Sequence, residues 1–250
     1  MSDTVVVGKG TGQAPAATAV DGAFEFLKTY DQGSGRAGLL PLDQAVAAAQ
    51  TQPAARKELE QRLLSALKTC KGTVGREYIC SKLAWIGSDA SVPVLAGLLG
   101  DAQLVAAARQ ALEAIPGRQA SKALREHVSK LIGQEKIGVI NSIGERRDAD
   151  SLRLLTKLLK ETNADIASAA AAAIGNVGTA RAGKVLRAYL PKAPEALRPK
   201  LADPILTCAE RLLVVGRGPE AAALYQSLAA SAQPAHIQTA VARGLKACGA

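Results

Sequence analysis

The stretch "AWIGSDASVPVLAGLLGD" (residues 84–101) carries the pattern that decides the fold of this 250-residue chain. It holds an Ile-Gly pair, a short polar turn and an apolar run that ends in Leu-Leu. Related stretches return along the chain. The Ile positions are Ile86, Ile115, Ile143 and Ile174, spaced by 29, 28 and 31 residues, and each is followed by Gly or Pro. Because Gly and Pro end helices, each pair predicts the C-terminal end of a helix.

A second apolar series lies between these Ile residues. Its members are Leu95, Leu124, Leu155 and Leu186, spaced by 29, 31 and 31 residues. A unit of about 30 residues therefore holds two helices, which we name the A helix (with the Leu) and the B helix (with the Ile). Apolar residues three and seven positions before each Ile follow the period of a helix, and Lys136 is the exception. Pro93 falls in the first turn of its A helix, where the missing N–H is harmless.

The repeat divides the chain into three predicted regions. Residues 1–20 form a flexible leader, residues 21–55 an N-terminal helical cap, and residues 56–250 the repeat array. The end units of such stacks must cover an exposed end, which explains the cap. The six predicted units are 56–87, 88–117, 118–148, 149–178, 179–216 and 217–249.

Composition agrees with a helical protein. Hydrophobic residues make up 48% of the chain but aromatic residues only 3%. The apolar content is mostly Ala and Leu, which favours helices over sheets. No apolar run approaches the length of a membrane span. The start of the chain has no signal peptide, so we expect a cytoplasmic protein as written, or a periplasmic or exported one if a native signal was removed.

The net charge of +9 is uneven along the chain. Residues 1–55 carry three Lys or Arg and five Asp or Glu, whereas residues 56–250 carry 28 and 17. The positive charge of residues 56–250 attracts anions in general, including nucleic acid, anionic membranes and acidic proteins. The charge alone does not indicate which of these is the partner.

The sequence resembles HEAT repeats of the short bacterial kind that also occur in phycobilisome-lyase-like proteins. The residues that carry this resemblance are "IGSDASVPVLAGLLGD" (86–101) and "AIGNVGTARAGKVLRAYL" (173–190). The pieces "AFEFLKTYD" (23–31), "GVINSIGERRDADS" (138–151) and "CAERLLVVGRGPEAAALY" (208–225) are similar to a group of bacterial HEAT-repeat proteins, often exported. The resemblance implies a right-handed α-solenoid of about six HEAT-like helical hairpins with an N-terminal helical cap. It brings no catalytic motif with it.

Residues able to hold a metal are sparse. The four cysteines are Cys70, Cys80, Cys208 and Cys248, and no CxxC occurs. The two histidines are His127, expected to be packed and half-buried, and His236, expected at the surface. Without ligands at close spacing we expect no metal site and no cofactor. If the protein is exported, a disulfide bond between Cys70 and Cys80 is an alternative to two free thiols.

Two further features allow a binding role. "GERRDAD" (144–150) concentrates charge in one turn, where Arg146 and Arg147 could contact an anion or could pair with the neighbouring carboxylates. The lone Trp85 could anchor a partner. We expect it instead to pack between the cap and the first repeats, because Trp is usually largely buried.

The resemblance to HEAT repeats implies that the B helices line the concave side of the solenoid. Positions two, five and nine residues before each Ile point away from the core. The predicted partner-binding residues at these positions are Glu77, Ser81, Gln110, Glu113, Gln134, Asn141 and Asp165. The excess basic residues fall mostly on the A helices, on the convex side: Lys57, Arg62, Lys68, Lys122, Arg125, Lys130, Arg153, Lys157, Lys184 and Arg187.

These features predict a non-catalytic scaffold that binds a protein or peptide through the concave face, since stacked helix pairs leave an extended concave surface. One alternative is a binder of nucleic acid or another polyanion through the basic convex face. A second is an enzyme of the HEAT-like lyase or DNA glycosylase type. The low aromatic content disfavours both, because it leaves few side chains for stacking on bases.

Overall fold

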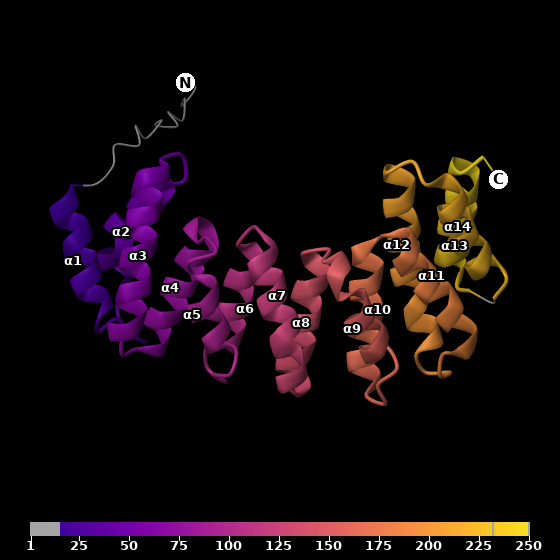
Figure 1. Cartoon of the computed structure of the whole chain (residues 1–250), viewed down its shortest axis with the longest axis horizontal. Coiled ribbons are helices and arrows are strands. Elements are labelled where there is room, and N and C mark those ends of the chain that lie inside the picture. The colour runs from indigo at the N-terminus through magenta and orange to yellow at the C-terminus, as the bar shows by residue number, and fades with distance from the viewer. Residues whose placement is uncertain (1–15, 232, 250) are drawn as a thin grey trace, which may run out of the picture.

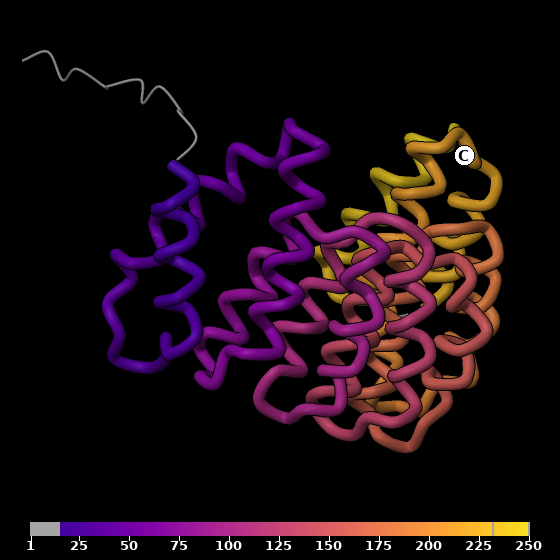
Figure 2. The backbone as a smooth tube through the Cα atoms, turned by 60° about the vertical axis from the view of Figure 1, so that its left-hand side comes forward, coloured from indigo at the N-terminus to yellow at the C-terminus, as the bar shows by residue number. Residues whose placement is uncertain are grey.

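The computed structural model describes residues 16–231 and 233–249. That part of the chain forms fourteen α-helices and five short 3₁₀ segments, with no β-strand. The helices follow one another along a curved array from α1 to α14 (Figure 1). In the tube view, successive hairpins lie beside one another (Figure 2). The predicted all-α solenoid is confirmed.

The first two helices, α1 (Ala17–Leu27) and α2 (Leu40–Ala49), pack on each other and on the next hairpin. The A helices are α3 (Pro53–Thr69), α5 (Val92–Leu98), α7 (Arg118–His127), α9 (Leu152–Leu158), α11 (Ala180–Tyr189) and α13 (Gly218–Ala229). The B helices are α4 (Thr73–Ile86), α6 (Val105–Ala114), α8 (Gly133–Glu145), α10 (Ala164–Val177), α12 (Ala202–Val214) and α14 (Ala235–Ala247). The 3₁₀ segments are η1 (Arg36–Leu39), η2 (Val128–Lys130), η3 (Ala149–Ser151), η4 (Leu190–Lys192) and η5 (Arg198–Leu201).

The predicted leader is too long at its C-terminal end. Helix α1 begins at Ala17, inside the segment 1–20 that was expected to be flexible. Val20 is already buried in the core, so apolar packing extends the helix N-terminally. Residues 1–15, which make up the rest of the leader, lie outside the described part of the chain. None of the described helices is long and apolar enough to cross a membrane.

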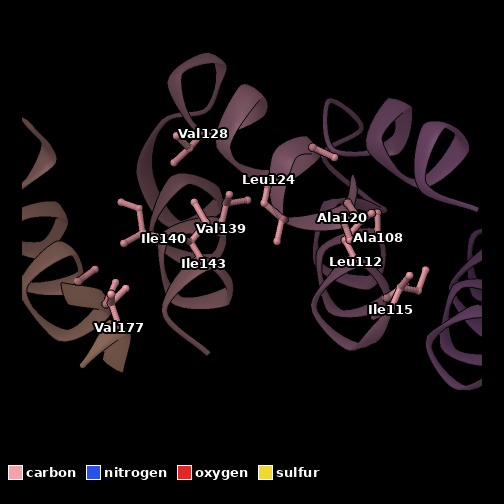
Figure 3. Packing of buried hydrophobic residues seen from close by; sticks show 14 of the residues in the cluster. Ala108, Leu112, Ile115, Ala120, Leu124, Val128, Val139, Ile140, Ile143 and Val177 are labelled. Carbon is pink, nitrogen blue, oxygen red and sulfur yellow. The ribbon is translucent and has the colours of Figure 1, made fainter. Parts of the chain in front are cut away.

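Both apolar series lie in the core. The Ile series and the Leu series have no exposed surface in any of the four units from which they were read. Both series belong to one cluster of buried hydrophobic residues. Figure 3 shows Ile115, Leu124 and Ile143 of these series among buried Ala, Leu and Val side chains. Lys136, the exception to the pattern, is half-buried and forms an ion pair with Glu161 at 2.9 Å. One continuous core therefore joins the hairpins.

The glycines after the Ile residues do not all end helices, so that part of the sequence interpretation is wrong. Gly144 lies inside α8 and Gly175 inside α10. A Cβ atom on Gly144 would lie 2.8 Å from the Cα of Ala173, and one on Gly175 would lie 2.5 Å from the carbonyl oxygen of Pro204. These glycines allow neighbouring B helices to approach each other closely, and Gly178, at φ +62°, ends α10 instead.

The B helices form the tighter layer of the stack. Each B helix from α4 to α12 packs against the next one along the chain. The A helices make comparable contacts only between α5 and α7 and between α11 and α13, among the described helices. In a curved stack the inner side has the shorter arc and brings its helices closer. The B helices therefore line the concave side, which we call the inner face, and the A helices form the convex side, the outer face.

The polar turn of the opening stretch is fixed by side chains of α3. Arg56 donates to the carbonyl oxygens of Ile86 and Gly87 at 2.8 and 3.0 Å. The buried carboxylate of Glu60, one turn later, accepts from Ser88 and from Ser91. These bonds satisfy the last carbonyls of α4 and hold the entry to α5.

Candidate functional site

The residues predicted for partner binding lie along the inner face. Six of them are exposed: Glu77, Ser81, Gln110, Gln134, Asn141 and Asp165. Glu113 is half-buried and already bonded, because its carboxylate accepts from Ser142 at 2.6 Å and pairs with Arg109 at 3.3 Å. Glu113 is thus a weaker candidate for contact with a partner than the other six.

A groove between α4 and α6 brings three of these residues together. Its volume is about 630 Å³. Glu77 and Ser81 reach it from α4 and Gln110 from α6. Its remaining lining residues are Tyr30, Arg36, Val74, Tyr78, Ala84, Trp85, Ala106, Ala107 and Ala111. Small alanines on α6 leave the space, and larger side chains of α4 and the cap form its walls.

Trp85 borders this groove and is not packed in the seam, so the expectation of a buried Trp is wrong. Its side chain is 64% exposed. It lies next to Ile86 on α4, but it points away from the core that Ile86 enters. Ser81 and Glu77, four and eight residues earlier, share its side of the helix.

Aromatic residues gather at the groove although the chain is poor in them. The full sequence has one Trp, four Tyr and two Phe, and three of these seven line the groove. Tyr30 and Tyr78 are in edge contact with ring centroids 6.3 Å apart, and Phe26 extends the cluster from Tyr30 at 5.6 Å. The low aromatic content of the whole chain therefore does not exclude a local cluster. We call Tyr30, Tyr78 and Trp85 the aromatic wall of the groove.

A charged cluster supports that wall from the cap. The carboxylate of Asp43 accepts from the Tyr78 hydroxyl at 2.8 Å and pairs with Lys82 at 2.7 Å and with Arg36 at 3.3 Å. Burial acts to raise the pKa of Asp43, but the hydrogen bonds from Lys82 and Tyr78 outweigh it and leave the pKa lowered. Burial and the bond to Asp43 raise the pKa of Tyr78, which remains a neutral phenol. At neutral pH the Tyr78 hydroxyl therefore donates to an ionised Asp43 carboxylate.

Arg146 does not serve as an anion contact, which corrects the sequence interpretation. Its guanidinium donates to the carbonyl oxygens of Leu112, Glu113, Ile115 and Gly117 and to the hydroxyl of Ser121. Burial lowers its pKa. The side chain caps the C-terminal end of α6, so most of its donors are used within the fold.

The other charges of the 144–150 turn also meet partners in the fold, with one exception. Arg125 pairs with Asp148, and Arg118 pairs with Asp150 at 3.0 Å. Arg147 is exposed, at φ +50°, and is the one Arg of this turn left on the surface.

The outer face carries the predicted basic residues, with one ordered row among them. Lys122, Arg153 and Lys184 are 31 residues apart, lie two positions before the Leu of their A helices, and are all exposed. Lys157 and Arg187 lie on the next turn of α9 and α11 and are also exposed. This row was not recognised in the sequence, although its spacing equals that of the Leu series.

The cysteines and histidines do not form a site among the described residues. All four cysteines are free, so the Cys70–Cys80 bridge is not formed in this structure. Burial raises the pKa of Cys80 to about 12 and that of Cys208 to about 11. His127 is half-buried, with Nδ1 2.8 Å from the carbonyl oxygen of Ala123, and His236 is exposed in the first turn of α14.

Comparison with known proteins agrees with this architecture. Residues 133–202, from α8 to the start of α12, match the family described as HEAT repeats. The matched residues form the α8–α11 hairpins of the helical solenoid. No curated protein matches the sequence of this solenoid. Among solved structures, a crystal structure described as an engineered protein matches at 18% identity with a TM-score of 0.41, covering 76% of this chain and 96% of that chain. HEAT repeats generally act as protein-interaction scaffolds, and folds of this kind are typical of non-enzymatic proteins.

Proposed function

We propose that this solenoid is a non-catalytic scaffold that binds an extended segment of a partner protein along its inner face. The observation that carries the proposal is the α4/α6 groove with the exposed Trp85 on its border. Large exposed aromatic side chains beside a concave surface are common anchors of interfaces. A volume of about 630 Å³ accommodates a few residues of an extended chain.

The polar residues of the inner face suit a peptide backbone. Gln110 lies in the groove and Asn141 lies exposed on the next B helix. A side-chain amide offers both a donor and an acceptor, so it can pair with the N–H and the C=O of an extended chain. Such pairing fixes position without requiring a particular partner sequence.

Site-specific photo-crosslinking tests which face holds the partner. A photoreactive amino acid is placed at Gln110 in one variant and at Lys157 in a matched variant, since both side chains are exposed and lie on opposite faces. We expect a crosslinked species in cells of the native host from position 110 and none from position 157. The species should disappear when Trp85 is also replaced by Ala. Crosslinking from position 157 alone would contradict the proposal.

The basic row on the outer face favours a second candidate function, the binding of a polyanion. Lys122, Arg153 and Lys184 repeat in register with the fold, and neutralising phosphates with such residues makes affinity strongly dependent on salt. If about three to five phosphates are contacted, the logarithm of the association constant of a duplex oligonucleotide should fall with the logarithm of salt at a slope of about −2.7 to −4.5. Arg153→Glu with Lys157→Glu should remove that binding. An oligonucleotide that does not bind at low salt excludes this candidate.

A further inference from the structure

We infer that the segment bound by the inner face is cationic, presenting Arg or Lys side chains, although the protein itself carries a net charge of +9. The inference rests on the proposed function and specifies its partner. It follows from three features of the described residues: the charges on the outward positions of five B helices, the pairing of the basic residues on those helices, and the groove beside Trp85.

The outward positions of the five B helices from α4 to α12 carry no basic residue. Leu212 is buried in α12 at the place that the Ile residues hold in the earlier B helices, with Ile205 and Ala209 buried seven and three positions before it. The rule of two, five and nine residues before this core residue therefore extends to α12. In α4, α6, α8, α10 and α12 these fifteen positions hold no Lys or Arg, and their charged members are Glu77, Glu113, Asp165, Asp203 and Glu210.

Four of the five basic residues elsewhere on the same helices are held in ion pairs. The ion pairs are Arg76 with Asp101 at 3.5 Å, Lys82 with Asp43 at 2.7 Å, Arg109 with Glu113 at 3.3 Å and Lys136 with Glu161 at 2.9 Å. Arg211, on α12, donates to the side-chain oxygen of Asn176 at 3.2 Å. By contrast, within the described part of the chain Glu77, Asp165, Asp203 and Glu210 are exposed and form no ion pair. The charge that helices α4 to α12 of the inner face offer to a partner is thus negative, whereas the last B helix, α14, exposes Arg243 and Lys246.

The groove combines the two groups that recognise a cationic side chain. Trp85 exposes its indole, and Trp is the best aromatic acceptor for a cation–π contact with Arg or Lys. Glu77 adds a carboxylate without an ion pair two helical turns away on the same side of α4. Arg36, the basic residue in the lining, already pairs with Asp43 and lies 5.9 Å from the centre of the Tyr78 ring. Because eight residues of helix span about 12 Å, one cationic side chain of a bound segment would stack on Trp85 and a second would meet the carboxylate of Glu77.

The alanines of α6 form an apolar surface against which the methylene groups of an Arg or Lys side chain can pack. Ala106, Ala107 and Ala111 line the groove opposite α4. The methylene groups of Arg and Lys bury well against apolar surface while the charged head remains near water. A shorter or acidic side chain would gain neither the stem contact nor the carboxylate.

Because Trp85 is the single Trp of the chain, its fluorescence reports directly on the groove. The probe is a short acetylated and amidated peptide in which Arg alternates with Ala, labelled for anisotropy. Two matched peptides have Gln or Glu in place of each Arg. We expect the Arg peptide to bind with a saturable change in Trp85 emission, and the Gln and Glu peptides to bind at least fivefold more weakly.

Variants locate the binding. Glu77→Gln should weaken the Arg peptide about two- to fivefold, the effect of one exposed ion pair. Trp85→Ala, followed by anisotropy, should weaken it about two- to tenfold, the effect of one cation–π contact together with lost apolar area. The matched control is Glu126→Gln on α7, which removes an exposed carboxylate from the outer face and should change nothing.

The outcomes separate this inference from the function on which it rests. If the Gln peptide binds as well as the Arg peptide, with the same Trp85 response, the inner face binds peptides but does not select cations, and the inference is overturned alone. If the Glu peptide binds best and Arg153→Glu with Lys157→Glu abolishes its binding, the outer face is the site and both proposals fail. If none of the three peptides binds, both proposals are overturned as well.

Discussion

The inner and outer layers of this solenoid come from the same repeat, yet they differ in packing and in charge. The B helices approach each other so closely that Gly144 and Gly175 have no space for a methyl group. The A helices are more widely spaced, and Gly97 on α5 has no atom within 4 Å of where a Cβ would lie. The inner face exposes carboxylates and amides, and the outer face exposes Lys and Arg. A repeat can therefore keep one core while its two surfaces specialise separately.

The largest expected effect concerns the core that the two layers share. Leu155→Ala should lower the free energy of unfolding by about 2–5 kcal/mol, because it removes a fully buried Leu between units. Arg153→Ala, two residues away on the outer face, should change it by less than about 0.5 kcal/mol. Urea denaturation followed by circular dichroism measures both. An equal response of the two variants would mean that α9 does not face the core as described.

The next effect distinguishes two adjacent arginines. Arg146→Met should lower the free energy of unfolding by about 2–3 kcal/mol, since several carbonyls at the end of α6 lose a charged donor. Arg147→Met, at an exposed position, should stay within about 0.5 kcal/mol. If Arg147→Met lowered the melting temperature more than Arg146→Met did, Arg146 would instead be a surface residue that is free to bind an anion.

A pair of glycine variants tests the difference in spacing between the layers. Gly144→Ala should destabilise by about 1–3 kcal/mol, the usual cost of overpacking, because the new methyl would meet Ala173 of α10. Gly97→Ala should stabilise by about 0.5–1 kcal/mol, because Ala favours a helix where there is room for it. Stabilisation by both variants would show that the B helices are not the tighter layer.

The smallest effect concerns thiols buried between the layers. With pKa values raised by burial to about 12 and about 11, the thiols of Cys80 and Cys208 are almost entirely un-ionised at pH 8. Only the half-buried Cys248 should react quickly with a thiol reagent in the folded protein, and all four should react in urea. Labelling of the buried thiols should accelerate as the pH rises, because the thiolate is the reactive form. Fast labelling of Cys80 at pH 8 would contradict its burial.

The fold could be read from the sequence because two apolar series at a constant spacing require a repeated packing environment. Ile86 and Leu95 mark the core for the same reason that Ile174 and Leu186 do. The C-terminal boundary of the leader is harder to predict from the sequence. Val20 is buried in the core, and no local sequence pattern indicates that burial. The glycines were misread because a Gly can end a helix or admit a neighbouring helix, and the sequence does not show which neighbour approaches.

The candidate site was predictable only in part. Helical geometry alone places Glu77, Gln110 and Asn141 on the outward side of their helices. The position of Trp85 depends on the cap, whose Tyr30 and Arg36 meet α4 from a distant part of the sequence. Arg146 looked available because its partners at the end of α6 lie about thirty residues before it. Long-range contacts therefore decide which polar residues remain free.

The central claim, that the inner face binds and the outer face does not, is tested most directly by two double variants measured against the crosslinked partner after its purification. Gln110→Ala with Asn141→Ala removes the two amides of the inner face, and Arg153→Glu with Lys157→Glu reverses two charges of the outer face. We expect the first pair to weaken binding about five- to thirtyfold, as for two lost hydrogen bonds, and the second to leave the dissociation constant within about twofold. Loss of binding in the charge-reversed pair, together with affinity that falls steeply with added salt, would instead assign binding to the outer face.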